Sequence, residues 1–487
     1  MKKIIYFLAI SILSGALVAQ PISLNPNNPH YFLFRGKPLV VVSSGEHYGS
    51  VLNPAFDFIR YLNTLQNDGM NYTRMFTGTY FEKDGSFGIE KNTLAPAAGM
   101  ALVPWKRSKE TGAVCGGNKF DMDQWDNSYF TRLKSFVSEA AKRGIIVEVT
   151  LFSSIYDYWS IQPWNPVNNI NIKEGLTKDN VQTLKNGPAL KYQENVVRKI
   201  VKELNEFDNV IYEIQNEPWS DHTVSIQPDK EFLNNEDFKL DGAEWQKRID
   251  IADKPSLDWQ KKIGSFIEDE EMKLKNQHLI AQNFSNFYYP VTEADQNISI
   301  MNFHYAYPIA VEKNYEHLKV IAFDESGFAG NADATYRKQA WKFIIAGGGL
   351  FNNLDYSFAV GKEDGTAVNK APGGGSPELR KQLRVLSEFI HSFDFVKMKP
   401  DHTTILLAQG SFARVLSEQG KQYAMYFNNG NRCTLKLNLP AGNYELKWIN
   451  TLNGNALKNE KLKHSGGALT LTSPDFSEDI ALKITLQ

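Results

Sequence analysis

The chain has 487 residues, more than one compact core usually holds, so two domains are expected. Hydrophobic residues make up 42% and charged residues 22%, a composition typical of a globular protein and not of a disordered one. The net charge is −2, and Lys and Arg are spread along the chain, so no basic stripe indicates a nucleic-acid partner.

The first 19 residues have the pattern of an export signal. Lys2 and Lys3 precede the apolar run IIYFLAISILSGALV, and the small residues Ala16 and Ala19 mark a cleavage point. The run is short for a membrane span, no later segment reaches its length, and no Cys near the cleavage point indicates a lipid anchor. We therefore expect a cleaved signal peptide over residues 1–19 and a periplasmic or secreted protein without a membrane span.

Short apolar runs alternate with amphipathic helical stretches from about residue 30 to residue 360. A hairpin with Gly36 at its turn comes first, and eight strand candidates follow, at 40–45, 71–78, 145–153, 209–219, 278–285, 298–308, 320–330 and 349–358. Eight strands that alternate with helices predict an α/β fold, a (β/α)8 TIM barrel, over residues 20–395. A doubly wound sheet is the alternative, but no Gly-rich phosphate loop follows the first strand.

The pattern changes after about residue 396. Seven short strands with alternating apolar residues follow one another, separated by Gly, Asn and Pro and without helices, which predicts a small all-β sandwich over residues 396–487. The only cysteines, Cys115 and Cys433, fall in different predicted domains. In an exported protein they could form a disulfide, and two free thiols are the alternative.

Polar residues stand where several predicted barrel strands end. The carboxyl ends of the strands form the active-site face of a TIM barrel, so these residues are the candidates for function. Each has an ordinary structural explanation when taken alone, such as a solvated carboxylate or a core histidine. The four strand ends offer Arg74 (second strand), Asn216 and Glu217 (fourth), His304, Tyr305 and Tyr307 (sixth), and Asp324 and Glu325 (seventh).

This set resembles the cellulase-like clan of retaining glycoside hydrolases, clan A. QNEP at 215–218 resembles the strand-four motif that carries the acid/base, and FDESG at 323–327 resembles the strand-seven motif that carries the nucleophile. MNYTRMF at 70–76 and NFHYAY at 302–307 resemble the strand-two Arg and the strand-six His and Tyr signatures. The resemblance implies that Glu217 and Glu325 are catalytic and that the substrate site includes Arg74, Asn216, His304 and Tyr305, with Tyr307 as the other candidate tyrosine. The C-terminal sandwich resembles accessory domains appended to such barrels.

Retaining hydrolysis by double displacement needs two carboxyl groups about 5 to 5.5 Å apart. Glu325 would attack the anomeric carbon as a carboxylate, and Glu217 would first give and later take a proton. We therefore expect a raised pKa at Glu217, from the nearby charge of Glu325 and from burial under Trp219. Arg74 would keep Glu325 ionised, and Asn216 would hold the sugar hydroxyl beside the reacting carbon.

Two strand ends depart from the clan pattern. The third strand ends in TLFSS without a His, and the eighth ends in LDYSF without a Trp, where Tyr356 or Phe358 could stack on the sugar instead. The long inserts at 79–127 and 220–255 could wall a cleft. No metal-ligand spacing is present, so neither a metal nor another cofactor is expected. Five loop or strand-end tryptophans could either bind sugar or anchor loops: Trp105, Trp125, Trp159, Trp164 and Trp219.

The sequence as a whole predicts an exported retaining glycoside hydrolase that acts on a β-linked polysaccharide or oligosaccharide. An α-L-arabinofuranoside is the alternative substrate within the same clan. A carbohydrate-binding pseudoenzyme is an alternative of another class, which the retention of both Glu217 and Glu325 disfavours. An adhesion protein that works through residues 396–487 is a third.

Overall fold

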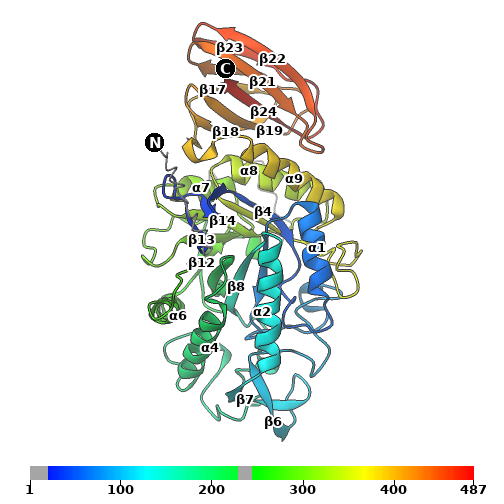
Figure 1. Cartoon of the computed structure of the whole chain (residues 1–487), viewed down its shortest axis with the longest axis vertical. Coiled ribbons are helices and arrows are strands. Elements are labelled where there is room, and N and C mark those ends of the chain that lie inside the picture. The colour runs from blue at the N-terminus through cyan, green and yellow to red at the C-terminus, as the bar shows by residue number, and fades with distance from the viewer. Residues whose placement is uncertain (1–19, 229–243) are drawn as a thin grey trace, which may run out of the picture.

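The computed structural model describes residues 20–228 and 244–487 (Figure 1). The predicted signal peptide, residues 1–19, lies outside the described residues. Within the described part of the chain, no helix is long and apolar enough to cross a membrane. Cys115 and Cys433 are both buried and unpaired, so the chain has free thiols and not the disulfide that the sequence left open.

Eight parallel strands form the barrel that the sequence predicts. They pair in the order β4-β15-β14-β13-β12-β9-β8-β5. Side-chain hydrogen bonds connect the two ends of this order, β4 and β5. The Ser43 hydroxyl donates to the Tyr72 carbonyl over 2.5 Å, and the Val42 N–H donates to the amide oxygen of Asn71, next to β5, over 3.3 Å. The strands are β4 (Val41–Gly45), β5 (Tyr72–Phe76), β8 (Ile146–Ser153), β9 (Val210–Asn216), β12 (Leu279–Asn286), β13 (Ile300–His304), β14 (Val320–Glu325) and β15 (Leu350–Leu354).

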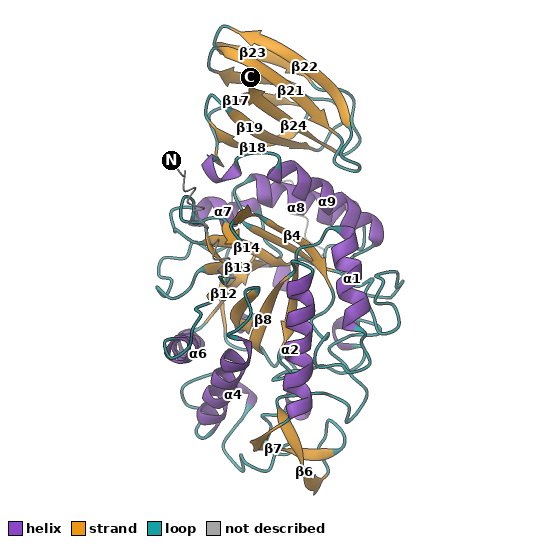
Figure 2. Cartoon of the chain, in the orientation of Figure 1, coloured by secondary structure: helices purple, strands orange, loops and turns teal. Residues whose placement is uncertain are grey.

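Helices surround these strands (Figure 2). Their apolar faces follow helical spacing, as in α4, where Val196, Val197, Ile200, Val201 and Leu204 are buried. The ends of α1 are set by capping: the Asp57 carboxylate accepts from the first backbone N–H groups, and Gly69 takes the left-handed conformation that ends the helix. The helices are α1 (Phe58–Asp68), α2 (Asn127–Lys142), α3 (Lys178–Val181), α4 (Ala189–Leu204), α6 (Lys254–Glu271), α7 (Pro308–Asn314), α8 (Asp333–Ile345) and α9 (Pro377–His391).

A small antiparallel sheet covers the amino-terminal end of the barrel. It consists of β1 (Ser23–Leu24), β2 (Phe32–Phe34) and β3 (Lys37–Leu39), with Gly36 at the predicted hairpin turn at a φ of 75°. Phe32 and Phe34 pack in one cluster with residues at the starts of the barrel strands, including Tyr72 and Ile146. This end is therefore filled with apolar side chains, and the opposite end is left for polar ones.

The two long inserts contain strands that the sequence did not predict. The first holds the hairpin β6 (Trp105–Thr111) and β7 (Asn118–Trp125), which projects at the end of the molecule away from the sandwich (Figure 1). The second holds β10 (Thr223–Ile226) and β11 (Ile249–Ala252), and β11 also pairs with β12. The first insert has an irregular sequence and the second a polar one, which is typical of loops, but pairing between strands shapes parts of both.

The C-terminal strands form the predicted sandwich of two antiparallel sheets. One sheet has the order β16-β18-β19-β24-β21-β22 and the other β17-β20-β23. The sandwich packs beside α8 and α9 (Figure 1). The strands are β16 (Lys399–Pro400), β17 (Ile405–Gln409), β18 (Phe412–Glu418), β19 (Gln422–Asn428), β20 (Thr434–Leu439), β21 (Gly442–Ile449), β22 (Ala456–His464), β23 (Gly467–Thr472) and β24 (Asp479–Leu486).

Candidate active site

A cavity lies at the carboxyl ends of the barrel strands. Glu217 and Glu325 both line it, together with Asn216 and Tyr305. One oxygen of each glutamate and a nitrogen of His304 all lie within 4.8 Å of one another. The strands β9 and β14 thus bring together two carboxylates that are 108 positions apart in the sequence.

Glu325 is the last residue of β14 and is surrounded by hydrogen-bond donors. The Tyr48 hydroxyl donates to Oε2 over 2.7 Å, and Arg74 Nη1 donates to the same oxygen over 3.1 Å. The Tyr305 hydroxyl lies 2.8 Å from Oε1. Only 5% of Glu325 is exposed, so these donors replace water around its charge.

Glu217 follows β9 directly and accepts hydrogen bonds on both oxygens. Oε1 lies 2.9 Å from His304 Nδ1 and 3.0 Å from the Tyr305 hydroxyl, and Oε2 accepts from the Tyr156 hydroxyl over 2.8 Å. Burial alone raises the pKa of Glu217, but the hydrogen bonds and the charge of His304, with the two tyrosines, outweigh burial and lower it. The sequence predicted a raised pKa, and that prediction is wrong because it omitted these donors.

His304 links the two glutamates with Asp324. Its Nδ1 lies 2.9 Å from Glu217 and 3.5 Å from Glu325, and its Nε2 lies 3.4 Å from Asp324. Burial lowers the pKa of His304, but the charges of Glu325 and Asp324 and the bond to Glu217 raise it well above the ordinary value. The pKa values of the two partners thus shift in opposite directions, which favours a proton on the imidazole of His304 over one on the carboxyl group of Glu217.

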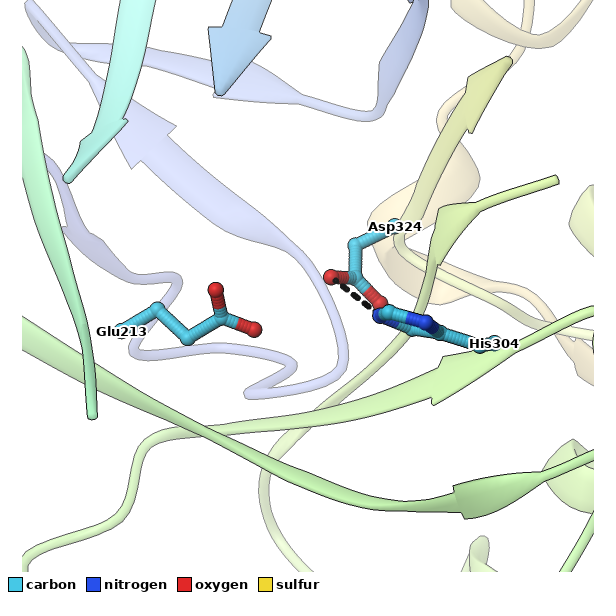
Figure 3. A group of neighbouring side chains, drawn as sticks. All are labelled: Glu213, His304 and Asp324. Carbon is cyan, nitrogen blue, oxygen red and sulfur yellow. Dashed lines mark ion pairs between the residues drawn. The ribbon is translucent and has the colours of Figure 1, made fainter. Parts of the chain in front are cut away.

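Arg74 is fully buried and is the cation of a carboxylate cluster beneath the two glutamates. Its Nε donates to Glu213 over 2.9 Å, its Nη2 donates to the Asn216 amide oxygen over 2.8 Å, and its Nε lies 3.6 Å from Asp324. Burial lowers the pKa of Arg74, but the carboxylates of Glu213 and Asp324 outweigh burial and raise it. Figure 3 shows Glu213 extending toward the paired His304 and Asp324.

Glu213, His304 and Asp324 are close enough to hold a metal ion, as are Glu217, His304 and Glu325. In the first group, however, Glu213 is already paired with Arg74 through Nε and Nη2, and Asp324 lies beside the same guanidinium. In the second group, each carboxylate accepts from at least one tyrosine hydroxyl. Positive charge and donors from the protein itself therefore occupy the positions that a cation would take.

The other residues chosen from the sequence differ in how they reach this cavity. Asn216 lines it, and its Nδ2 donates to the Tyr156 hydroxyl over 2.9 Å. Trp219 is buried, with its ring edge-on to His304 at 5.6 Å, so it packs behind the histidine. Tyr307 packs against Phe287, and its N–H donates to the Phe287 carbonyl over 3.0 Å. Neither Trp219 nor Tyr307 belongs to the lining of the cavity.

The tryptophans singled out in the sequence do not line the cavity. Trp105 and Trp164 are buried and pack edge-on against each other at 5.0 Å, so they anchor loops. The aromatic lining consists of tyrosines and phenylalanines, among them Tyr356 of the eighth strand end. Phe358, the alternative residue there, instead packs edge-on against Tyr61.

Sequence reasoning missed several residues of the site. Tyr48 follows the first strand and Tyr156 follows the third, and each donates to one of the two glutamates. His47 and Glu82 also line the cavity and form an ion pair at 3.2 Å. Tyr156 is close to the strand-three end where a His was missing. Their residue types alone did not point to the site. The signal available in the sequence was that these tyrosines come shortly after predicted barrel strands.

Backbone strain gathers around the same cavity. Six of the non-glycine residues with a positive φ line it: Tyr48, Phe87, Tyr156, Glu217, Tyr305 and Phe328. Their φ angles range from 44° to 61°, in the left-handed region that side chains disfavour. Strained residues of this kind cluster at functional sites, where the surrounding structure holds them in place. This observation supports the cavity as the functional site independently of its carboxylates.

Comparisons with known proteins give likenesses in structure only. No protein-family model matches the sequence, and no curated protein is detectably similar to it. A solved structure described as a glycoside hydrolase is 12% identical, with 96% of this chain and 97% of that chain covered and a TM-score of 0.61. A glycoside hydrolase family 5 structure from Bacteroides vulgatus is 11% identical, with 96% and 93% covered and a TM-score of 0.61. The chain therefore shares its fold with these proteins over nearly its full length.

Proposed function

We propose that this protein is a retaining glycoside hydrolase, with Glu325 as the nucleophile and Glu217 as the acid/base. Its substrate is a carbohydrate, in the first place a β-linked glycan, and the leader pattern over residues 1–19 supports a periplasmic or secreted location. One observation carries the proposal: oxygens of Glu217 and Glu325 lie within 4.8 Å of each other. Retaining enzymes need about 5 to 5.5 Å between the carboxyl groups, whereas inverting enzymes need about 6.5 to 9.5 Å.

The first step forms a bond between Glu325 and the sugar. A Glu325 oxygen attacks the anomeric carbon, the bond to the leaving oxygen breaks, and a proton from the Glu217–His304 pair goes to that oxygen. The resting proton lies on His304, 2.9 Å from Glu217 Oε1, so one transfer along this hydrogen bond makes Glu217 the acid. The attack also consumes the charge of Glu325, which helped to hold the proton on His304.

The second step releases the sugar. Glu217, now a carboxylate, takes a proton from water, and the oxygen of that water attacks the anomeric carbon and displaces Glu325. Tyr305 supports both steps, because its hydroxyl is within hydrogen-bond distance of both glutamates and can donate to only one at a time. It can therefore follow the charge from Glu325 to Glu217.

The proposal is tested with purified protein and a panel of β-glycans, arabinans and aryl glycosides. We expect Glu325→Ala to abolish turnover with the fold intact, and NMR of the first product to show retained anomeric configuration. Glu217→Ala should slow substrates with poor leaving groups far more than activated aryl glycosides, because only the former need the acid. Inverted product, or equal loss on both substrate types, would contradict the assignment. Binding without turnover across the panel would instead indicate a carbohydrate-binding pseudoenzyme.

A further inference from the structure

Two buried polar atoms of the cavity lining have no hydrogen-bond partner within the described part of the chain. They are Nδ1 of His47 and the hydroxyl oxygen of Tyr356. His47 is 9% exposed and Tyr356 is 6% exposed. Their rings are neighbours, with centroids 5.9 Å apart. Leaving such a group unpaired is unfavourable, so this pair points to a ligand that completes it.

Both residues lie on the nucleophile's side of the cavity. Tyr48 connects them to it, since its hydroxyl donates to Glu325 and its ring centroid lies 5.4 Å from that of His47. Tyr156 bonds Glu217 and not Glu325, whereas Tyr305 lies between the two glutamates. In a double displacement, the sugar that becomes attached to the nucleophile lies on that side, and the leaving group lies beside the acid. His47 and Tyr356 are therefore placed against the attached sugar.

Residues 80–94, here called the wall segment, form one side of the cavity. Its side chains Glu82, Phe87, Ile89 and Leu94 line the cavity. The segment is tied to the loop after the first strand, because the Thr93 hydroxyl donates to the His47 carbonyl over 2.8 Å and the Asn53 amide donates to the Thr93 carbonyl over 3.0 Å.

The wall segment is also tied to the loop that carries Tyr356. The Glu90 N–H donates to the Lys370 carbonyl over 3.0 Å, and the Lys370 N–H donates to the Glu90 carboxylate over 3.3 Å. The Tyr356 ring is held as well, since a Cβ on Gly373 would lie only 2.7 Å from it. A sugar chain that continued past the attached residue would have to displace this joined wall.

We propose that His47 and Tyr356 bind neighbouring hydroxyl groups of a single terminal sugar, so that the protein removes residues one at a time from the non-reducing end of a chain. The inference rests on the proposed hydrolase function and names the substrate class of that same site. His47 is held for this role by Glu82, which bonds its Nε2 and leaves Nδ1 facing the sugar. A hydroxyl suits both atoms, because it can donate and accept.

The first test is the position of cleavage. Wild-type protein is incubated with borohydride-reduced oligosaccharides of three to six sugars from cellulose, mannan, xylan, galactan and arabinan, and with 4-nitrophenyl monosaccharides. We expect the monosaccharide to be the first and only small product, released from the end opposite the reduced sugar. Early internal fragments would overturn the inference and leave the hydrolase function standing. Absence of hydrolysis on every compound would overturn the hydrolase function, and the inference with it.

The second test assigns the two hydroxyls with 4-nitrophenyl glycosides that each lack one hydroxyl group. For wild type, kcat/KM should fall roughly 10- to 100-fold when a hydroxyl that His47 or Tyr356 binds is removed. Tyr356→Phe should abolish the penalty at one position and His47→Gln at the neighbouring one, since Gln keeps only the Nε2-side contact with Glu82. His47→Asn should retain that penalty, because Asn places its amide where Nδ1 was.

Tyr129→Phe is the matched control for this test. The Tyr129 hydroxyl is also buried without a hydrogen-bond partner, but it lies on α2 and outside the cavity lining. Removing it should leave the whole deoxy-sugar profile unchanged. If each variant lowers kcat/KM by the same factor on every substrate, the residues act on the fold and not on sugar hydroxyls. The inference would then be wrong.

Discussion

At the scale of single residues, the site is an arrangement of buried charges in which each group is defined by its neighbours. Glu217 and Glu325 are chemically identical, yet one is bonded to His304 and two tyrosines and the other to Arg74 and two tyrosines. A mobile proton lies beside the first and a permanent cation beside the second. This difference in partners suits the two carboxylates to the different roles that we propose for them.

The charge on His304 makes stability depend on pH in a definite direction. Its pKa in the folded protein is raised well above the ordinary 6.5, so the stabilisation is fully present below about pH 6.5 and is lost as pH rises through the folded-state pKa. We expect the free energy of unfolding of wild type to fall over that alkaline range relative to His304→Gln, which lacks the proton. Urea unfolding at a series of pH values measures this. Parallel pH curves for the two proteins would contradict a charged His304.

Arg74 should be essential to the fold as well as to the site. Replacing it with Met leaves Glu213, Asp324 and Glu325 buried without their cation, and loss of one partner of a buried pair costs about 3 to 5 kcal/mol. Arg35→Met is the control, because Arg35 is half-exposed and its pair with Asp208 should contribute at most about 1 kcal/mol. Denaturant unfolding compares the two variants, and a similar small loss in both would show that the buried cluster neutralises itself.

At the scale of elements, the wall segment depends on a close approach of two backbones. A Cβ on Gly49 would lie 2.1 Å from the Thr93 carbonyl oxygen, so Gly49→Ala must push residues 92–94 outward. We expect a loss of about 1 to 3 kcal/mol in stability and a raised KM, because this side of the cavity moves away from the substrate. Gly264→Ala is the control: its Cβ would meet Ile214 at an ordinary 3.5 Å. An unchanged KM in Gly49→Ala would argue that the wall does not contact substrate.

The same scale shows what the sequence could predict. All eight barrel strands were predicted, because buried parallel strands are continuous apolar runs bounded by polar ends. In the sandwich, β22 was not predicted, since this largely exposed strand, rich in Lys and Asn, at the end of its sheet has little apolar alternation. His47 and Glu82 were not singled out for the site, although the insert at 79–127, which contains Glu82 and the wall segment, was expected to wall a cleft. Their positions follow from hydrogen bonds between loops, which have no local pattern in the sequence.

At the scale of the whole molecule, a buried ion pair and a pair of stacked aromatic rings help to join the sandwich to the barrel. Arg337 of α8 donates from Nη2 to Asp479 of β24 over 2.8 Å, and the Tyr426 hydroxyl donates to the same carboxylate over 2.8 Å. Trp341 stacks on Tyr426 with centroids 5.4 Å apart. The lining of the cavity, in contrast, comes from barrel residues between His47 and Tyr356. The contact between the sandwich and the barrel is therefore separate from the cavity.

Because of this separation, we predict that the contact between Arg337 and Asp479 contributes to stability and not to catalysis. In Arg337→Met, Asp479 stays buried without its cation, which should cost about 3 to 5 kcal/mol. The double variant Arg337→Met with Asp479→Asn should recover part of that loss, because no buried charge remains unpaired. At a temperature where all proteins stay folded, kcat and KM should equal those of wild type. Unfolding followed by tryptophan fluorescence and assays on one aryl glycoside measure both properties. A fall in kcat without a loss of stability would mean that the sandwich acts on the catalytic site through α8.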